Sequence, residues 1–133
     1  MELTWGDRCF VCGKGNVGGL QLDFAIDPER RTCETRWTPP PTYQGYDDIL
    51  HGGLVSTLLD ECVGKLAAEL GLPAVTAELT VRFLRPIPLG RPLHARGELT
   101  EVGRRVILGE AEIRLEDQTL AARATAKLIR SSG

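Results

Sequence analysis

The sequence lacks an excess of charge of either sign. Its 133 residues include 16 Lys and Arg and 18 Asp and Glu, giving a formal net charge of -2, and the basic residues are spread along the chain without clustering. Recognition of a nucleic-acid backbone requires a basic patch or stripe. We therefore expect no nucleic-acid partner.

Long apolar runs are also absent. The first ten residues, MELTWGDRCF, contain no cationic start followed by an apolar core, and no apolar run approaches the roughly 20 residues that span a bilayer. We therefore expect no membrane association and a cytoplasmic location. Internal repeats and low-complexity segments are lacking too, and the length suits one compact domain, so residues 1–133 are expected to form a single domain.

Cysteines are few. Cys9, Cys12, Cys33 and Cys62 are too few and too unevenly spaced for a secreted disulfide scaffold, so reduced thiols are expected. Cys9 and Cys12 form a CxxC, which is half of a common structural zinc motif. Such a site needs four ligands, and the sequence contains no second CxxC or HxxxH. We accordingly expect no bound metal.

What the chain does contain is an alternation of apolar residues on both sides of one helical segment. The alternation predicts six strands, at residues 20–26, 33–37, 74–88, 93–102, 105–115 and 119–130. On the longest strand candidate the predicted inward face is Val75, Ala77, Leu79, Val81 and Phe83. Short turns between the later strands favour antiparallel pairing. The pattern indicates an α+β domain in which one sheet curls around one helix or meets a partner.

Residues 53–70 show helical periodicity. The predicted core-facing stripe is Val55, Leu59, Cys62, Leu66 and Leu70. Glu61, Lys65 and Glu69 follow one another at four-residue spacing, which predicts an exposed ladder of ion pairs.

Asp60 is harder to explain from the helix pattern. Its neighbours three and four residues away, Ser56, Thr57, Val63 and Gly64, include no cation. Two interpretations fit equally well on that pattern alone. Asp60 is either a partly desolvated, reactive carboxylate or a solvated or subunit-interface residue.

The HGG motif precedes this helix. Gly52 and Gly53 lie where the first backbone N–H groups of a helix have no intrahelical partner, and without side chains they leave room for a carbonyl oxygen to accept from those groups. His51 is expected to cap or position this turn, because no acid that would make it a catalytic base is near in sequence. His94 falls on the polar phase of its strand and is expected to face solvent.

HGGLVSTLLDEC, residues 51–62, resembles the active-site helix of hotdog-fold acyl-CoA thioesterases of the phenylacetate-degradation (PaaI) type. CFVCGKGNVGGLQLDF, YQGYDDILHGG and TAELTVRFLRPIPLG are similar to further segments of that family in the same order. The resemblance implies a hotdog fold, in which about six antiparallel strands curve around one long central helix. It also implies active sites at a subunit interface, in a homodimer at minimum and a homotetramer as the expected assembly.

The resemblance also implies roles for individual residues. Asp60 would act as general base or nucleophile, and the Gly52 N–H would polarise the thioester carbonyl while His51 holds the turn. Thr76, on the polar phase of its strand, would contact the reacting water or the substrate. No cofactor is implied, because CoA is part of the substrate.

The sequence indicates the substrate-binding residues less directly. Several members of the family have Asn or Gln six residues before the histidine; here that position is Gly45, so Gln44 is the expected substitute. The alternative is Asp47 or Asp48 at the edge of the acyl pocket, although a solvated loop is the more ordinary interpretation of those two. Gly53, in the HGG motif, is a further candidate for substrate binding. Arg82 and Arg85 are the expected partners of the CoA phosphates. Candidates for an aromatic wall of the acyl pocket are Trp5, Phe10, Phe24, Trp37, Tyr43 and Tyr46.

Two alternatives to hydrolysis stay open. One is a non-catalytic protein that binds acyl-CoA. The other is a hydratase or dehydratase on the same fold, which the HGG motif disfavours because that chemistry is associated with HFPG. The acyl group is not specified by any motif.

Overall fold

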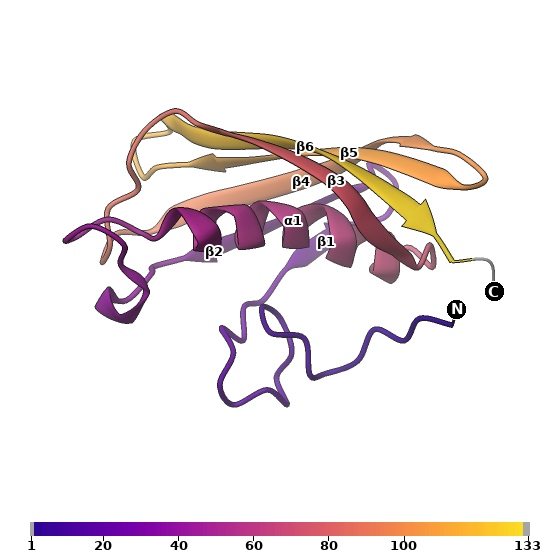
Figure 1. Ribbon diagram of the computed structural model, residues 1–133, viewed down its shortest axis with the longest axis horizontal. Coiled ribbons are helices and arrows are strands. Elements are labelled where there is room, and N and C mark those ends of the chain that lie inside the picture. Colours follow the sequence, from indigo (N-terminus) through magenta and orange to yellow (C-terminus); the bar gives the residue numbers. More distant parts are fainter. Residues whose placement is uncertain (1, 132–133) are drawn as a thin grey trace.

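The computed structural model describes residues 2–131, which form one sheet, one long helix and one short 3-10 helix (Figure 1). The elements are β1 (Ala25–Asp27), β2 (Thr32–Trp37), η1 (Pro41–Tyr43), α1 (Gly52–Glu69), β3 (Ala74–Phe83), β4 (Leu93–Val102), β5 (Val106–Arg114) and β6 (Leu120–Arg130). All paired strands are antiparallel, in the order β1-β2-β4-β5-β6-β3. The predicted α+β class is confirmed.

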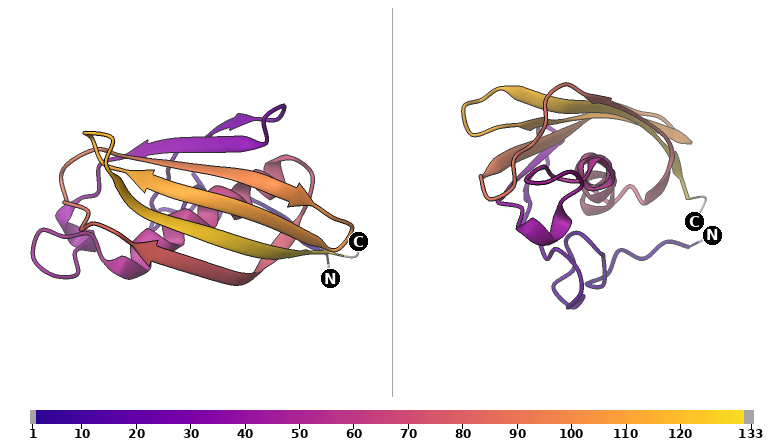
Figure 2. Two further views of the ribbon diagram at one scale, coloured as in Figure 1. Left: turned by 90° about the horizontal axis from the view of Figure 1, so that it is seen from above. Right: turned by 60° about the vertical axis from the view of Figure 1, so that its left-hand side comes forward.

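Helix α1 lies inside the curve of the sheet, which Figure 2 shows along and across the helix. The side chains of Leu58, Leu59 and Leu66 on the helix are completely buried, as are Ile107 and Ile113 on the facing strand. This is the arrangement that the resemblance implies. Within residues 2–131 no helix combines the length and apolarity needed to cross a bilayer.

Two glycines set how closely the helix approaches the sheet. A Cβ atom added at Gly97 on β4 would lie 2.4 Å from the carbonyl oxygen of Cys62, and one added at Gly109 on β5 would lie 2.6 Å from Val63 Cγ1. No side chain fits at either position. The middle of α1 therefore rests almost directly on the backbone of two central strands.

Strand β3 forms one edge of the sheet and contains a bulge. Its register with β6 passes from Thr76 opposite Leu128 to Glu78 opposite Lys127, so Ala77 has no partner. The extra residue shifts the side-chain alternation by one position. Thr76 therefore lies on the same face as the buried Leu128, the face that carries helix α1.

The bulge corrects the predicted inward face of this strand. Leu79 and Val81 are partly buried against the core, as predicted, and Phe83 shares their face opposite the buried Ala122, although the end of the strand leaves its ring exposed. Val75 and Ala77, which precede Glu78, are exposed. Strict alternation assumed one residue per partner along the whole strand, which fails at the bulge. The predicted polar-phase assignment of Thr76 fails for the same reason.

The predicted strand at residues 20–26 is mostly not a strand. Only Ala25–Asp27 pair, as β1. The backbone N–H groups of Leu20 and Leu22 instead donate to Phe10 and Val11 within the N-terminal segment. Residues 2–24 contain no helix or strand, and this segment lies beneath α1 on the side away from the sheet (Figure 1).

Both ends of α1 are specified locally. The helix begins at Gly52, one residue before the predicted start, and His51 is its N-cap, with Nδ1 accepting the Gly53 N–H at 2.8 Å. At the other end Gly71 has a φ of 76°, a conformation that favours glycine. Its N–H donates to Ala68 O at 3.1 Å, and the chain turns toward β3.

Gly97→Ala is expected to lower the free energy of unfolding by about 1 to 3 kcal/mol, because the new methyl group overlaps the Cys62 carbonyl. Gly64→Ala is the matched control. Its Cβ meets nothing within 4 Å, so the helix should gain up to about 1 kcal/mol. Urea denaturation of both variants measures the difference. A Gly97→Ala protein as stable as wild type would contradict the close approach of helix and sheet.

His51→Ala is expected to lower the free energy of unfolding by about 1 kcal/mol, because the Gly53 N–H loses its acceptor. His51→Asn should retain most of the stability, since an Asn side-chain oxygen accepts the same hydrogen bond. Urea denaturation again provides the measurement. Equal losses in the two variants would show that His51 stabilises the fold by some means other than the cap.

Candidate active site

The HGG turn presents one unpaired backbone donor. His51 is fixed by its own N–H, which donates to Tyr43 O at 2.9 Å, and by its cap bond to Gly53. The Gly53 N–H is therefore already used. No residue within 2–131 accepts the Gly52 N–H, and Gly52 is exposed, so Gly52 is the donor available to a ligand.

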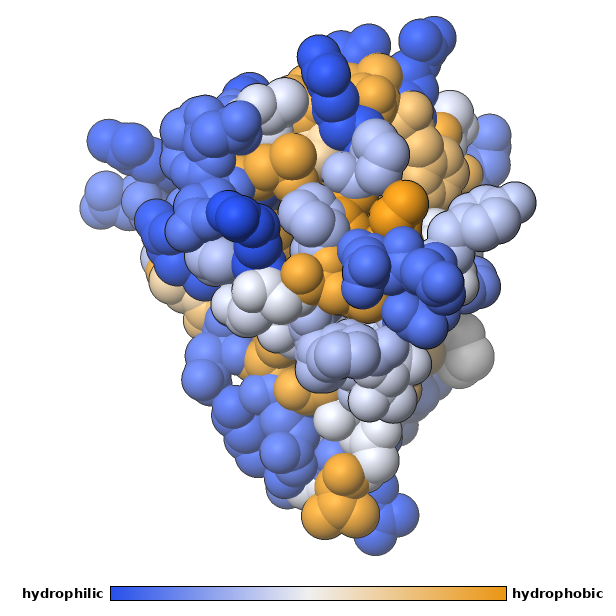
Figure 3. Space-filling model, turned by 90° about the vertical axis from the view of Figure 1, so that its left-hand side faces the viewer, coloured by the Kyte–Doolittle hydropathy of each residue, from blue (hydrophilic) through white to orange (hydrophobic). Residues whose placement is uncertain are grey.

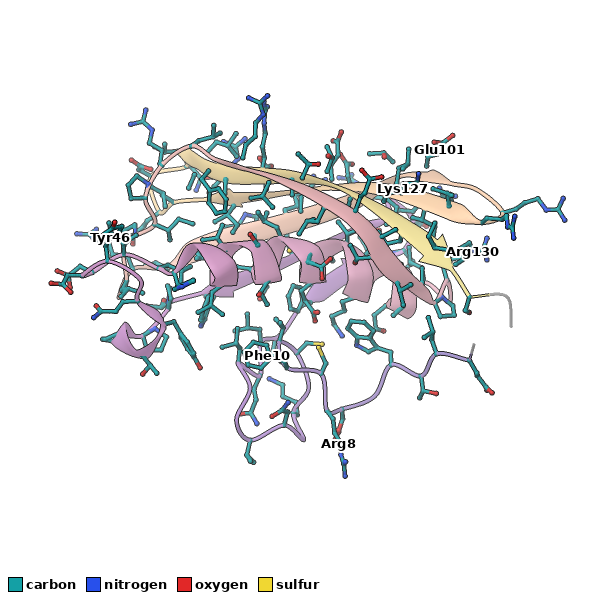
Figure 4. All side chains as sticks on the ribbon, in the orientation of Figure 1. Arg8, Phe10, Tyr46, Glu101, Lys127 and Arg130 are labelled. Carbon is teal, nitrogen blue, oxygen red and sulfur yellow. The ribbon has the colours of Figure 1, made fainter. Side chains whose placement is uncertain are left out.

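A groove of about 700 Å³ runs past this donor, a size in the range of small-molecule sites. Its lining residues are Gly45, Tyr46, Ile49, Leu50, His51, Gly52, Val55, Phe83, Leu84, Arg85, Pro86, Ile87 and Ala122. Most are apolar, and Arg85 supplies a cation. Figure 3 faces the end of the molecule at which α1 begins, where apolar surface lies between hydrophilic side chains. Figure 4 labels Tyr46 at this end.

Asp60 lies farther along α1 and contacts β3. Thr76 Oγ1 donates to Asp60 Oδ1 at 2.6 Å. The bulge at Ala77 is what turns the threonine toward the helix. No ion pair joins Asp60 to a cation within the described part of the chain. One carboxylate oxygen accepts from a neutral donor, and among residues 2–131 the other accepts no hydrogen bond.

The donor and the carboxylate do not meet within one chain. Asp60 follows Gly52 by eight residues, which corresponds to an axial distance of about 12 Å and a rotation of roughly 80° around the helix. The groove at Gly52 contains neither Asp60 nor Thr76 among its lining residues. The structure thus brings together Asp60 with Thr76, and His51 with Gly52 and Gly53, as two separate half-sites.

The predicted phosphate-binding arginines also separate. Arg85 lines the groove beside His51. Arg82 instead points to the outer face of the sheet, where it borders a different hollow together with Arg96 and Arg114. Only Arg85 therefore lies near the predicted donor.

The remaining predicted residues have local roles. Gln44 Oε1 accepts the Asp48 N–H at 3.2 Å and so braces the loop before the helix. His94, predicted to face solvent, is half-buried, and its Nε2 lies 3.0 Å from Glu34 Oε2 on the neighbouring strand. Of the aromatic candidates, only Tyr46 lines the groove at Gly52. Trp37 and Tyr43 pack together with ring centroids 5.7 Å apart.

Glu61 is the residue that sequence reasoning misplaced. Lys65 and Glu69 form the predicted ion pair at 2.9 Å, but Glu61 is only 6% exposed and does not join an exposed ladder. It faces the N-terminal segment, where the Cys9 thiol donates to its carboxylate at 3.4 Å. The buried stripe of α1 is therefore wider than predicted. One sequence feature could have indicated that Glu61 is buried. It lies three residues after the apolar Leu58 and directly before Cys62, and both of these residues are buried.

Burial changes the acidity of the groups around Glu61. It raises the pKa of the Glu61 carboxyl, an effect opposed by hydrogen bonds from Cys12 and Cys9. Burial, followed by the hydrogen bond to Glu61, raises the pKa of the Cys12 thiol to about 12. All four cysteines are free thiols, as expected from the sequence.

Comparison with known proteins places the chain in a family. The model of the Thioesterase superfamily matches residues 48–122, more than half of the chain. Acyl-coenzyme A thioesterase THEM4 of Bos taurus is 29% identical over 122 residues, which cover 88% of this chain and 49% of the bovine protein. The chain spans about half the length of the curated relatives that it matches.

Solved structures agree with that assignment. A thioesterase superfamily protein superposes with a TM-score of 0.85 and 28% identity, covering 92% of this chain and 60% of the other. The E. coli PaaI protein from the phenylacetic acid degradation operon superposes with a TM-score of 0.78 and 25% identity, covering 86% and 82%. The resemblance carried by the helix motif and the hotdog fold that it implied are both confirmed. This chain belongs to the thioesterase superfamily.

Proposed function

We propose that this protein hydrolyses acyl-CoA thioesters to a free acid and CoA, with Asp60 and the Gly52 N–H as the reacting machinery. The observation that carries the proposal is the 2.6 Å hydrogen bond from Thr76 to Asp60. This hydrogen bond holds the Asp60 carboxylate, which has no neighbouring cation. The bulge at Ala77 turns the donor, Thr76, toward it.

Either of two reactions fits this arrangement. As general base, Asp60 removes a proton from water while the water oxygen attacks the thioester carbon, and the Gly52 N–H stabilises the negative charge on the carbonyl oxygen. The carbon–sulfur bond then breaks, and the CoA thiolate takes up a proton. As nucleophile, the Asp60 carboxylate attacks the thioester carbon and expels the CoA thiolate, which takes up a proton. Water then hydrolyses the acyl–Asp60 anhydride, which releases the free acid and restores the carboxylate.

A second copy of the chain brings the two half-sites together in this proposal. β3 is an edge strand, so its outer edge is open to pairing within the described sheet. Antiparallel pairing with β3 of a second copy, centred near Leu79 and Thr80, sets the Thr76 end of one strand opposite the Phe83 end of the other. Phe83 lies against Gly52, where an added Cβ would be 3.6 Å from its ring. The second copy's Gly52 thereby approaches Asp60.

The same pairing fixes the smallest assembly that we propose. Each homodimer has two equivalent sites, each with Asp60 and Thr76 from one subunit and His51 and Gly52 from the other. A homotetramer formed from two such dimers is the larger assembly. In either case Arg85, in the groove beside Gly52, is the better placed arginine for the CoA phosphates, and Arg82 is the alternative.

Relatives support this assignment. The bovine relative is named an acyl-coenzyme A thioesterase, and a hypothetical thioesterase from Streptococcus pneumoniae, 21% identical, has been crystallised with coenzyme A. Other structures of that bacterial protein carry an Asp-to-Ala or a Thr-to-Ala substitution, at positions separated by 16 residues, like Asp60 and Thr76 here. The shared spacing supports the proposal that Asp60 and Thr76 lie at the centre of an acyl-CoA hydrolase site.

The first test is release of free thiol from a panel of acyl-CoAs, with short to long aliphatic chains plus phenylacetyl and benzoyl groups. Asp60→Asn is expected to reduce kcat by roughly 10²- to 10⁴-fold, because the base or nucleophile is lost. Thr76→Val should reduce it by roughly 10- to 100-fold, and Thr76→Ser should restore much of it. Glu69→Gln, on the same helix, is the control and should be unaffected.

The alternatives have distinct outcomes in this assay. Acyl-CoA binding without turnover on any substrate would identify a binding protein. Equal turnover by wild type and Asp60→Asn would remove Asp60 from the mechanism. The ranking of the substrates identifies the acyl group, which the groove alone does not specify.

The two-copy site is tested with hybrid dimers. Gly52→Pro removes the N–H while keeping a residue suited to the first helical position, and should lower kcat by about 10²- to 10³-fold. The His51 ψ of 132° tolerates a following proline. Hybrids of Asp60→Asn and Gly52→Pro chains, purified with two different affinity tags, should recover about half of the wild-type turnover, because one of the two sites is intact.

Homodimers of each variant provide the controls for this experiment. If the site lay within one chain, both sites of the hybrid would be damaged, and the hybrid would be as inactive as the parents. A protein that stays monomeric at all concentrations in analytical ultracentrifugation would also contradict the two-copy site.

A further inference from the structure

Three potential metal ligands converge on the side of α1 opposite the sheet. The thiols of Cys9 and Cys12 and the carboxylate of Glu61 lie within 4.8 Å of one another. The cysteines come from the N-terminal segment beneath the helix, where Figure 4 labels their neighbour Phe10. Glu61 comes from α1, 52 residues beyond Cys9. The CxxC half-site thus has a third ligand that no sequence spacing reveals.

The turn that carries the two thiols is firmly built. The Gly13 N–H donates to Cys9 O at 2.9 Å, which closes the CxxC into a tight turn. A Cβ at Gly13 would lie 2.3 Å from Asp7 O, so only glycine fits there. Val11, between the cysteines, is 4% exposed, and its carbonyl accepts the Leu22 N–H at 2.8 Å. Both thiols are therefore held in position against the helix.

The carboxylate at this cluster has no full counter-charge. Glu61 is buried, and within residues 2–131 no ion pair joins it to a cation, because the Lys65 ammonium is bound by Glu69 at 2.9 Å. Its hydrogen-bond donors are thiols, which are weak donors. Buried carboxylates are normally paired with a cation or coordinate a metal.

We propose that Cys9, Cys12 and Glu61 bind a zinc ion, with water as the fourth ligand. Cys9 Sγ lies 3.4 and 3.6 Å from the two Glu61 oxygens. Sulfur and oxygen ligands at ~2.3 and ~2.1 Å from a tetrahedral zinc are separated by about 3.6 Å, so little movement is required. Two thiolates with one carboxylate suit a borderline-soft dication better than magnesium or calcium.

The ion would fasten the N-terminal segment to the helix. Residues 2–24 contain no helix or strand. A metal ion shared between this segment and α1 would hold the segment in place by coordinate bonds. Zinc binding displaces the thiol protons of Cys9 and Cys12 into solvent. The site is separate from Asp60, whose partner Thr76 lies on β3, so the inference does not depend on the proposed hydrolysis.

The test uses tag-free protein purified under reducing conditions. Wild type is expected to contain about one equivalent of zinc per chain by mass spectrometry, or to take up one equivalent after chelation and titration with zinc chloride. Zinc should raise the melting temperature of the chelated protein. Cobalt chloride should produce thiolate-to-cobalt charge-transfer absorption together with the visible bands of a tetrahedral ion.

Matched variants assign the ligands. In the cobalt-loaded protein, Cys9→Ser and Cys12→Ser should each abolish or halve the thiolate-to-cobalt charge-transfer band. Glu61→Gln should lower the affinity for zinc by more than roughly 10- to 100-fold, which is the cost of losing a residue that only supports a ligand. Cys33→Ser and Glu69→Gln are the controls and should bind zinc like wild type. Circular dichroism establishes that each variant is folded.

Three results would overturn the inference. The first is wild-type protein that neither contains zinc nor binds zinc or cobalt, a result that is independent of how the variants fold. The second is binding that survives in all three ligand variants. The third is a Cys9–Cys12 disulfide in the reduced preparation, detected as two thiols fewer than the four of the free chain when thiols are counted after chelation and denaturation, which also release any zinc-bound thiolate.

Discussion

The close contact between one helix and one sheet is the constraint on which the rest of the structure depends. A single helix must cover the whole concave face, so it has to lie deep, and Gly97 and Gly109 make that depth possible by removing side chains beneath Cys62 and Val63. β3 forms one edge of this sheet and contacts the helix through Thr76 and Asp60. Both half-sites of the proposed enzyme lie along that edge.

Helix α1 also presents polar groups toward three different parts of the molecule. Its first residue, Gly52, offers a backbone donor at the exposed end, while Asp60 faces the inner side of β3. Glu61, one residue later, is turned by about 100° and faces the N-terminal segment. Adjacent acidic residues thus have unrelated surroundings: Asp60 is partly exposed and bonded to Thr76, whereas Glu61 is buried among thiols.

Much of this could be predicted from the sequence, because it depends on local pattern. The helix ends, to within one residue, and the bounds of β4 follow from periodicity and turn residues. Two features do not. The bulge at Ala77 is set by the pairing of β3 with β6, and the burial of Glu61 depends on a segment 52 residues away. Both are non-local, and both determine which side chains meet at a site.

The pairing of β3 also affects the order in which the chain can fold. β3 precedes β4, β5 and β6 in sequence, yet it pairs only with β6 within the described sheet. During synthesis β3 can contact the preceding helix early, but its pairing within the chain must wait until the ribosome has released β6. The surface that carries Thr76 is among the last to be completed.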